Sequence, residues 1–143
     1  DVVYAHEHGP KGGDEINIIK PANNYGWPVI SYGVNYDGTM VSNETHHEGM
    51  EQPIVKWVPS IAPAGMTFYT GDKHAELKGD LIVSALAGMQ IRQVDLEDGK
   101  VAGENILIEG DERYRMIITG PDGEIYVSID NPDGAIFRLD KVE

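Results

Sequence analysis

The sequence contains no cysteine among its 143 residues. This excludes disulfide bonds, thiolate nucleophiles and zinc–sulfur sites, so oxygen and imidazole groups remain as the ligands and bases available for chemistry. No apolar run approaches the ~18 residues of a transmembrane helix, and the first residues lack the basic and then apolar pattern of a secretion signal. We therefore expect no membrane insertion, while the composition leaves the compartment open.

Basic residues are also scarce. The chain carries 11 Lys and Arg against 24 Asp and Glu, which gives a formal charge of −13. A charge of this sign repels nucleic acid and anionic lipid, so neither is an expected partner. Carboxylates suit divalent cations such as calcium, although most surface carboxylates are simply solvated.

The third absence is helical periodicity. Short β-rich runs alternate with Gly, Asp, Asn and Pro turns, and no segment keeps the i, i+3, i+4, i+7 apolar spacing of an amphipathic helix. The sequence therefore predicts an all-β fold. The predicted strands are Val2–Ala5, Glu15–Ile19, Met66–Thr70, Leu81–Leu86, Ile91–Leu96, Met116–Thr119, Glu124–Ile129 and Ala135–Leu139.

An internal repeat is present. Gly79–Ser84 aligns with Gly123–Ser128 at an offset of 44 positions, and Ile91–Asp95 aligns with Ile136–Asp140 at an offset of 45, so the second hairpin has one additional residue. Repeats of ~40–50 residues built from short strands are typical of β-propeller blades. A closed propeller needs at least about four blades, which predicts that this chain is one part of a longer protein.

A third copy is predicted at the start of the chain, where Asp1–Ala5 and Glu15–Ile19 flank a hairpin loop at Gly9–Gly13. A long inserted loop then occupies residues 20–63, and loops of this length usually carry function. We therefore expect residues 1–143 to form about the last three blades of a single β-propeller domain.

The hairpin loop at Glu7–Glu15 is a candidate cation site. It combines three carboxylates and a histidine with Gly and Pro, and calcium prefers oxygen ligands that include main-chain carbonyls. A tight polar hairpin with solvated charges explains the same residues. A metal-dependent, lactonase-type propeller with His8, Asp14 and Glu15 around a catalytic ion is a further alternative.

Two arginines precede a predicted apolar strand. Arg113 and Arg115 lie on the same side of an extended segment, and paired guanidinium groups bind multiply anionic ligands. A quinone with three carboxylates is one such ligand. The alternative is that the arginines pair with Asp111, Glu112 or other nearby acids at the surface.

Together these motifs resemble the soluble glucose and aldose sugar dehydrogenases that depend on pyrroloquinoline quinone, the glucose/sorbosone dehydrogenase family. The resemblance spans nearly the whole chain. The motifs that carry it are Glu7–Pro10, Gly12–Glu15, Asn23–Pro28, Tyr32–Tyr36, Pro59–Pro63, Gly71–Asp72, Ala85–Gly88 and Arg113–Arg115.

The resemblance implies a six-bladed propeller and oxidation of the anomeric hydroxyl of aldoses to lactones, with hydride transfer to pyrroloquinoline quinone. It also implies calcium, an electron acceptor as partner, the N-terminal half of the propeller and a periplasmic or secreted location. The implied metal ligands are the carbonyls of Gly9 and Pro10, with Glu15 and Tyr25 at a second, structural calcium. The implied cofactor-binding residues are Tyr36, Ser60, Ala85, Leu86, Ala87, Arg113 and Arg115.

The family's proton-abstracting histidine belongs to an earlier blade, so no catalytic residue is expected in this chain and the isolated chain is expected to be inactive. Some glucose-specific relatives have a lysine in the segment that matches Ala85–Ala87, and its absence here places the chain towards the broader aldose branch. A calcium-stabilised propeller that binds a ligand without catalysis is the remaining alternative.

Overall fold

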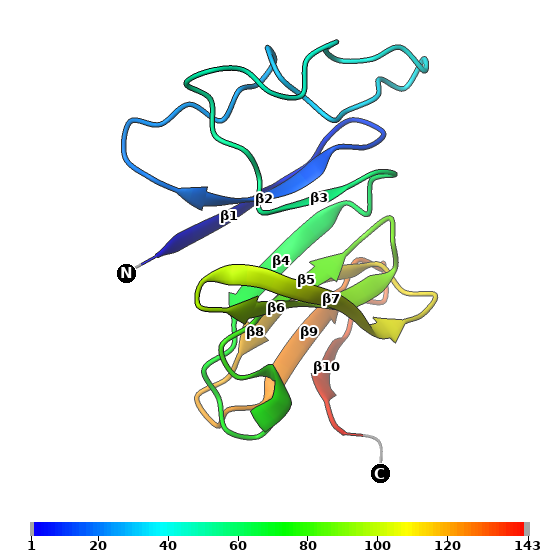
Figure 1. The fold of residues 1–143 in the computed structure, drawn as a ribbon. Helices are drawn as coiled ribbons and strands as arrows, with labels where there is room; N and C mark the ends of the chain where they lie inside the picture. The colour runs from blue at the N-terminus through cyan, green and yellow to red at the C-terminus, as the bar shows by residue number, and fades with distance from the viewer. Residues whose placement is uncertain (1, 142–143) are drawn as a thin grey trace. The chain divides into compact units, whose positions relative to one another are not determined.

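The structure, a computed structural model, describes residues 2–141, which form ten β-strands in three antiparallel sheets (Figure 1). The all-β prediction is confirmed. The described part of the chain contains one helical element, the 3-10 turn Ala75–Leu77, which is far too short to cross a membrane. The chain divides into two compact units, Asp1–Ala62 and Pro63–Glu143.

The first unit contains one sheet of three strands in the order β1-β2-β3. Strands β1 (Val3–Glu7) and β2 (Asp14–Ile19) form the hairpin predicted as the third repeat copy, with Val3 opposite Ile19 and Glu7 opposite Glu15. The first residue of that predicted copy, Asp1, lies outside the described residues. The sequence did not predict strand β3 (Val55–Trp57), which at three residues is too short for a recognisable pattern.

Residues 20–54 connect β2 to β3 through a series of turns. Two isolated β-bridges hold this segment together, Asn24 with Met50 and Val34 with Met40. Backbone bonds add to them, because Ser31 N–H donates to the carbonyl of Glu44 at 3.0 Å. The segment is therefore ordered through its own backbone.

The second unit contains a four-stranded sheet, β4-β5-β6-β7, and a three-stranded sheet, β10-β9-β8. The strand bounds are β4 Pro63–Phe68, β5 Leu81–Ala85, β6 Gln90–Glu97, β7 Lys100–Glu109, β8 Tyr114–Thr119, β9 Ile125–Ile129 and β10 Ile136–Leu139. The sequence did not predict β7, although it is the longest of these strands. Its side chains are largely exposed and several are charged, which is how edge strands avoid pairing with other chains and which removes the apolar signal of a strand.

The strand register agrees with the sequence repeat. Ser84 pairs with Ile91 in the β5–β6 hairpin, and the aligned residues Ser128 and Ile136 pair in the β9–β10 hairpin. The first strand of each sheet shares an irregularity as well, because the register shifts between Pro63 and Gly65 in β4 and between Tyr114 and Met116 in β8. The two sheets are therefore copies of one structural unit, including its β-bulge.

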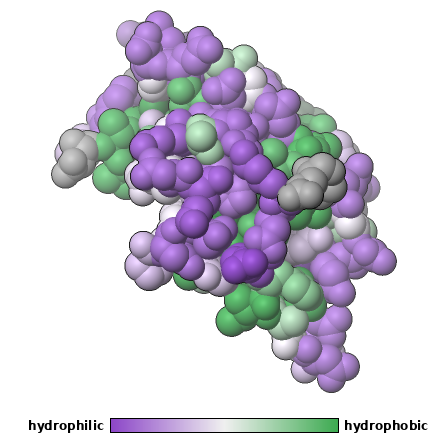
Figure 2. Space-filling model, turned by 90° about the horizontal axis from the view of Figure 1, so that it is seen from below, coloured by the Kyte–Doolittle hydropathy of each residue, from purple (hydrophilic) through white to green (hydrophobic). Residues whose placement is uncertain are grey.

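The core of the second unit lies between its two sheets. One face of the β4–β7 sheet packs against one face of the β8–β10 sheet, through Tyr69, Leu77, Ile82, Ile91, Tyr114, Ile117, Ile125 and Val127. The opposite face of the β8–β10 sheet is open: Ile136 is 75% exposed, whereas its repeat equivalent Ile91 is fully buried. Hydrophilic residues dominate the face of the molecule drawn in Figure 2, with hydrophobic residues gathered in separate patches.

Candidate functional site

A buried carboxylate organises the predicted cation loop of the first unit. Asp14 is fully buried at the start of β2. Its Oδ1 accepts a hydrogen bond from Gly9 N–H at 2.8 Å. Its Oδ2 accepts bonds from the Ser60 hydroxyl at 2.7 Å and from the amides of Ile61 and Ala62 at 2.8 and 2.9 Å. One side chain therefore fixes the Gly9–Pro10 turn to the segment that follows β3.

The loop itself requires glycine. A Cβ on Gly9 would lie 2.0 Å from the carbonyl oxygen of Gly12, and Gly13 has a φ of +83° with Gly33 N only 2.5 Å from where a Cβ would be. Among residues 2–141, no hydrogen-bond donor contacts the carbonyl oxygens of Gly9 or Pro10. These two oxygens fit the ligand chemistry of calcium.

The predicted ligands of the second, structural calcium line one small cavity. Glu15 and Tyr25 border a volume of about 20 Å³ together with Glu7, His8, Gly9, Gly13, Trp27, Ile30 and Ser31. This volume is enough for one water molecule or one ion. The Tyr25 hydroxyl donates to the carbonyl of Ile18 at 3.0 Å and accepts from Lys20 N–H at 2.7 Å, so the tyrosine ties the start of the long segment to the end of β2.

The carboxylates of Glu7 and Glu15 at this cavity accept hydrogen bonds from the same side-chain amide. Asn17 Nδ2 donates to Glu7 Oε1 at 2.8 Å and to Glu15 Oε2 at 3.2 Å. Burial raises the pKa of the Glu15 carboxyl, the hydrogen bond from Asn17 opposes this shift, and the charge of Glu7 adds to it. Lys56, which pairs with Glu15 across β2 and β3, lowers the same pKa. The site thus holds two neighbouring carboxylates beside one lysine, and a cation at the cavity would stabilise both charges.

Ser60 and Tyr36, the predicted cofactor-binding residues of the first unit, differ in their environment. Ser60 uses its hydroxyl within the protein, because it donates to Asp14 and accepts a bond from Ala62 N–H at 3.1 Å. Tyr36 is 81% exposed in a turn closed by a bond from Asn35 N–H to the carbonyl of Thr39. Tyr36 is therefore accessible to a ligand, whereas Ser60 is an anchor of its loop.

In the second unit, both predicted arginines contact one acid. Arg113 Nε lies 3.3 Å and Arg115 Nη2 3.2 Å from Oδ2 of Asp130. The ion pairs with Arg115 and Arg113 hold the pKa of Asp130 below its usual value. The arginines therefore pair with a nearby acid, but it is neither Asp111 nor Glu112.

Asp130 was not predicted from the sequence. The register of the β8–β9 hairpin is the signal that indicates it, because Tyr114 pairs with Ile129 and the residues next to this pair at the open end of the hairpin are Arg113 and Asp130. Asp130 N–H also donates to the carbonyl of Arg113 at 2.7 Å. Arg115 is the additional residue of the bulge that follows.

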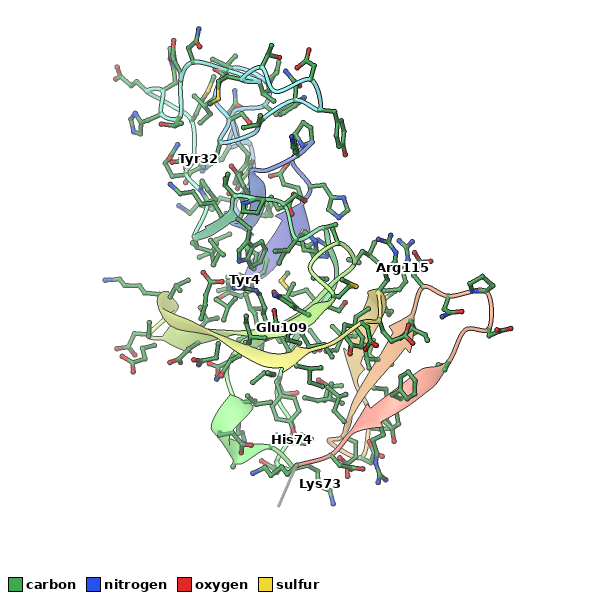
Figure 3. The ribbon with its side chains drawn as sticks, turned by 90° about the vertical axis from the view of Figure 1, so that its right-hand side faces the viewer. Tyr4, Tyr32, Lys73, His74, Glu109 and Arg115 are labelled. Carbon is green, nitrogen blue, oxygen red and sulfur yellow. The ribbon has the colours of Figure 1, made fainter. Side chains whose placement is uncertain are left out.

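The predicted segment Ala85–Ala87 lies at the same end of this unit as the arginines. The start of β4 is paired with the end of β5 through Pro63 and Ala85, and β4 runs alongside β8, where Thr67 Oγ1 lies 3.1 Å from Thr119 Oγ1. The hairpin after β5 contacts the segment before Arg113, since Gly110 N–H donates to the carbonyl of Met89 at 3.1 Å. Figure 3 shows Arg115 at one end of these sheets and Lys73 and His74 at the other.

The opposite end of the unit contains no predicted site residue. A cavity of about 560 Å³ lies there between the turns at residues 70–73 and 119–123. Across residues 2–141, no three His, Asp or Glu side chains are grouped closely enough to hold a metal ion on their own. Both oxygens of Asp14 already accept hydrogen bonds from the protein, and no such group of three is formed within the described residues, so the lactonase-type arrangement of His8, Asp14 and Glu15 has no support in this geometry.

Comparison with known proteins gives consistent matches. The family model described as Glucose / Sorbosone dehydrogenase matches residues 1–138. The chain is 36% identical over 142 residues to the aldose sugar dehydrogenase YliI of Escherichia coli, a match that covers 97% of this chain and 38% of that protein.

Two solved structures extend these matches. One is described as glucose dehydrogenase, with 38% identity and a TM-score of 0.94 over 99% of this chain and 42% of its own. The other, the form of the Streptomyces coelicolor aldose sugar dehydrogenase bound to pyrroloquinoline quinone, has 25% identity and a TM-score of 0.67 over 92% of this chain and 35% of its own. The chain thus spans about two fifths or less of the length of these relatives.

Proposed function

Because the chain belongs to the glucose/sorbosone dehydrogenase family, we propose that it is part of a quinoprotein that oxidises the anomeric hydroxyl of aldoses to lactones with pyrroloquinoline quinone and calcium. The observation that carries the proposal is the convergence of Arg113 and Arg115 at one end of the second unit, beside the Ala85–Ala87 hairpin. The relative from Streptomyces coelicolor, described as bound to the same quinone, supports it.

The proposed architecture is a six-bladed propeller. Its support is the packing of the second unit, in which the face of the β4–β7 sheet that carries Ile91 covers the β8–β10 sheet on the face opposite its repeat equivalent Ile136. The open face of the β8–β10 sheet carries Met116, Ile118 and Ile136, each more than half exposed. A further sheet of the same kind would cover this face in a closed ring.

Each candidate residue has a proposed role. When bound, the quinone accepts hydride and calcium supplies Lewis acidity. The Gly9 and Pro10 carbonyls hold that calcium, while Glu15 and Tyr25 hold a second, structural one. Arg113 and Arg115 bind the carboxylates of the quinone, and Tyr36, Ser60 and Ala85–Ala87 line it.

Proton abstraction is assigned to a histidine elsewhere in the complete polypeptide, so the residues of this chain bind and orient the cofactor. A periplasmic or secreted location and a separate electron acceptor complete the proposal. Both follow from the family alone.

The test is reconstitution of the complete polypeptide that carries this sequence. Pyrroloquinoline quinone and calcium are added together, quinone absorbance reports binding, and sugar-dependent dye reduction reports activity. We expect binding and dye reduction with several aldoses, and loss of both after calcium chelation. Quinone binding without dye reduction would contradict the proposed catalysis and support a non-catalytic binding protein. An experimental structure with Gly9–Pro10 more than ~15 Å from Arg113 and Arg115 would overturn the shared cofactor site, because one quinone could not reach both.

A further inference from the structure

Asp130 is the one acid that contacts both candidate cofactor arginines within the described residues. We propose that Asp130 is a positioning residue, which holds the two guanidinium groups side by side in the orientation that receives an anionic ligand. The inference rests on the proposed function, because the ligand is taken to be the quinone.

A single oxygen, Oδ2, contacts Nε of Arg113 and Nη2 of Arg115. The contact to Arg113 is made from the side of its guanidinium, so both terminal Nη groups of that arginine remain to form a bidentate pair with a carboxylate. Arg115 likewise keeps further N–H donors. Asp130 therefore restrains both side chains while using few of their donors.

Two guanidinium groups at one carboxylate repel one another, and a half-exposed arginine without a partner samples many rotamers. Asp130 reduces the repulsion and restricts this freedom before the ligand arrives. A preorganised pair loses less conformational entropy on binding than two mobile arginines would lose.

Arg115 is the additional residue of the β8 bulge, and strand pairing alone does not fix its direction. Asp130 follows β9 and is held in place, because its own N–H donates to the carbonyl of Arg113 at 2.7 Å. The side chain of Asp130 thus starts from a fixed point on the neighbouring strand and supplies the restraint that the bulge removes.

The experiment compares three variants of the complete polypeptide. Asp130→Asn removes the charge at constant size, Asp130→Glu retains it, and Asp133→Asn is the control, because Asp133 is an exposed residue of the next turn. Quinone affinity is measured by equilibrium titration of absorbance with excess calcium, and the sugar KM and kcat are measured at saturating quinone.

We expect Asp130→Asn to weaken quinone binding by roughly tenfold, Asp130→Glu to recover part of the loss, and Asp133→Asn to match the parent. The kcat and the sugar KM at saturating quinone should stay unchanged, and so should the midpoint of thermal unfolding without cofactor. Unchanged or tighter quinone binding in Asp130→Asn would overturn the inference, since Asp130 would then compete with the ligand. A parent protein that binds no quinone would instead overturn the proposed function.

Discussion

Asp14 and Asp130 each organise the candidate site residues of one unit, but in opposite environments. Asp14 is fully buried and accepts four hydrogen bonds from neutral donors in its own unit. The Asp130 side chain is 38% exposed and contacts two cations that are about half exposed themselves. A buried carboxylate with neutral donors makes a loop rigid, whereas an exposed ion pair contributes little to stability and can only set direction.

The largest effect is expected for Asp14→Ala. The change removes the acceptor that four donors share and leaves the amides of Gly9 and Ile61 without one. The amide of Ala62, a residue with an unfavourable φ of +52°, keeps only its 3.1 Å bond to Ser60 Oγ. We expect the free energy of unfolding to fall by on the order of 3–5 kcal/mol, together with loss of calcium binding at Gly9–Pro10. Urea unfolding and calcium titration of the complete polypeptide test this. A variant as stable as the parent would remove the distinction between the two carboxylates.

Arg115→Ala tests the other half of the comparison. Loss of one guanidinium leaves a quinone carboxylate without its partner, so quinone affinity should fall by roughly thirtyfold or more. Activity should return at high quinone concentration, with an unchanged ratio of rates on two aldoses. A changed ratio at unchanged quinone affinity would place Arg115 at the sugar.

Ser60→Ala removes one of the four donors to Asp14 and separates anchoring from cofactor contact. We expect a loss of about 0.5–1.5 kcal/mol in the free energy of unfolding and little change in quinone affinity, because the hydroxyl is already used within the protein. Chemical unfolding and quinone titration provide the two measurements. A large loss of quinone affinity at unchanged stability would show that Ser60 contacts the cofactor directly.

The smallest effect concerns the titration of Asp130. Its pKa is held below the usual 3.8 by Arg115 and Arg113. A depressed carboxyl pKa stabilises the fold above the unfolded-state value, and this contribution is lost as the pH falls through the folded-state value. Carbon NMR of aspartate-labelled protein should show a midpoint below 3.8, which Arg115→Gln moves upward. A midpoint that Arg115→Gln leaves in place would contradict the ion pair.

The sequence predicted the hairpins of the fold well and its edges poorly. Strands such as β5 and β9 combine apolar residues with explicit turns, and the aligned serines Ser84 and Ser128 occupy equivalent positions in the register. Strand β7 escaped prediction because an exposed edge needs no apolar face. In the site, Arg113 and Arg115 are recognisable as a local motif. Asp130 contacts Arg115 across the β8–β9 hairpin, and Asp14 contacts Ser60 from 46 positions away, so only strand pairing or the fold brings these residues together.

The bulge at Arg115 links the length of β8 to its candidate ligand contacts. Side chains of a strand alternate between faces, and the additional residue lets Tyr114 pair with Ile129 while Ile117 pairs with Val127. Deleting Arg115 would leave both pairs in register, so Ile117 would stay in the core and the arginine alone would be lost. The hairpin loops also vary in length, since the β9–β10 loop has one residue more than its counterpart after β5. Insertions and deletions in relatives should therefore accumulate in the loops, and a deletion at the bulge should remove a candidate ligand contact without shifting the core.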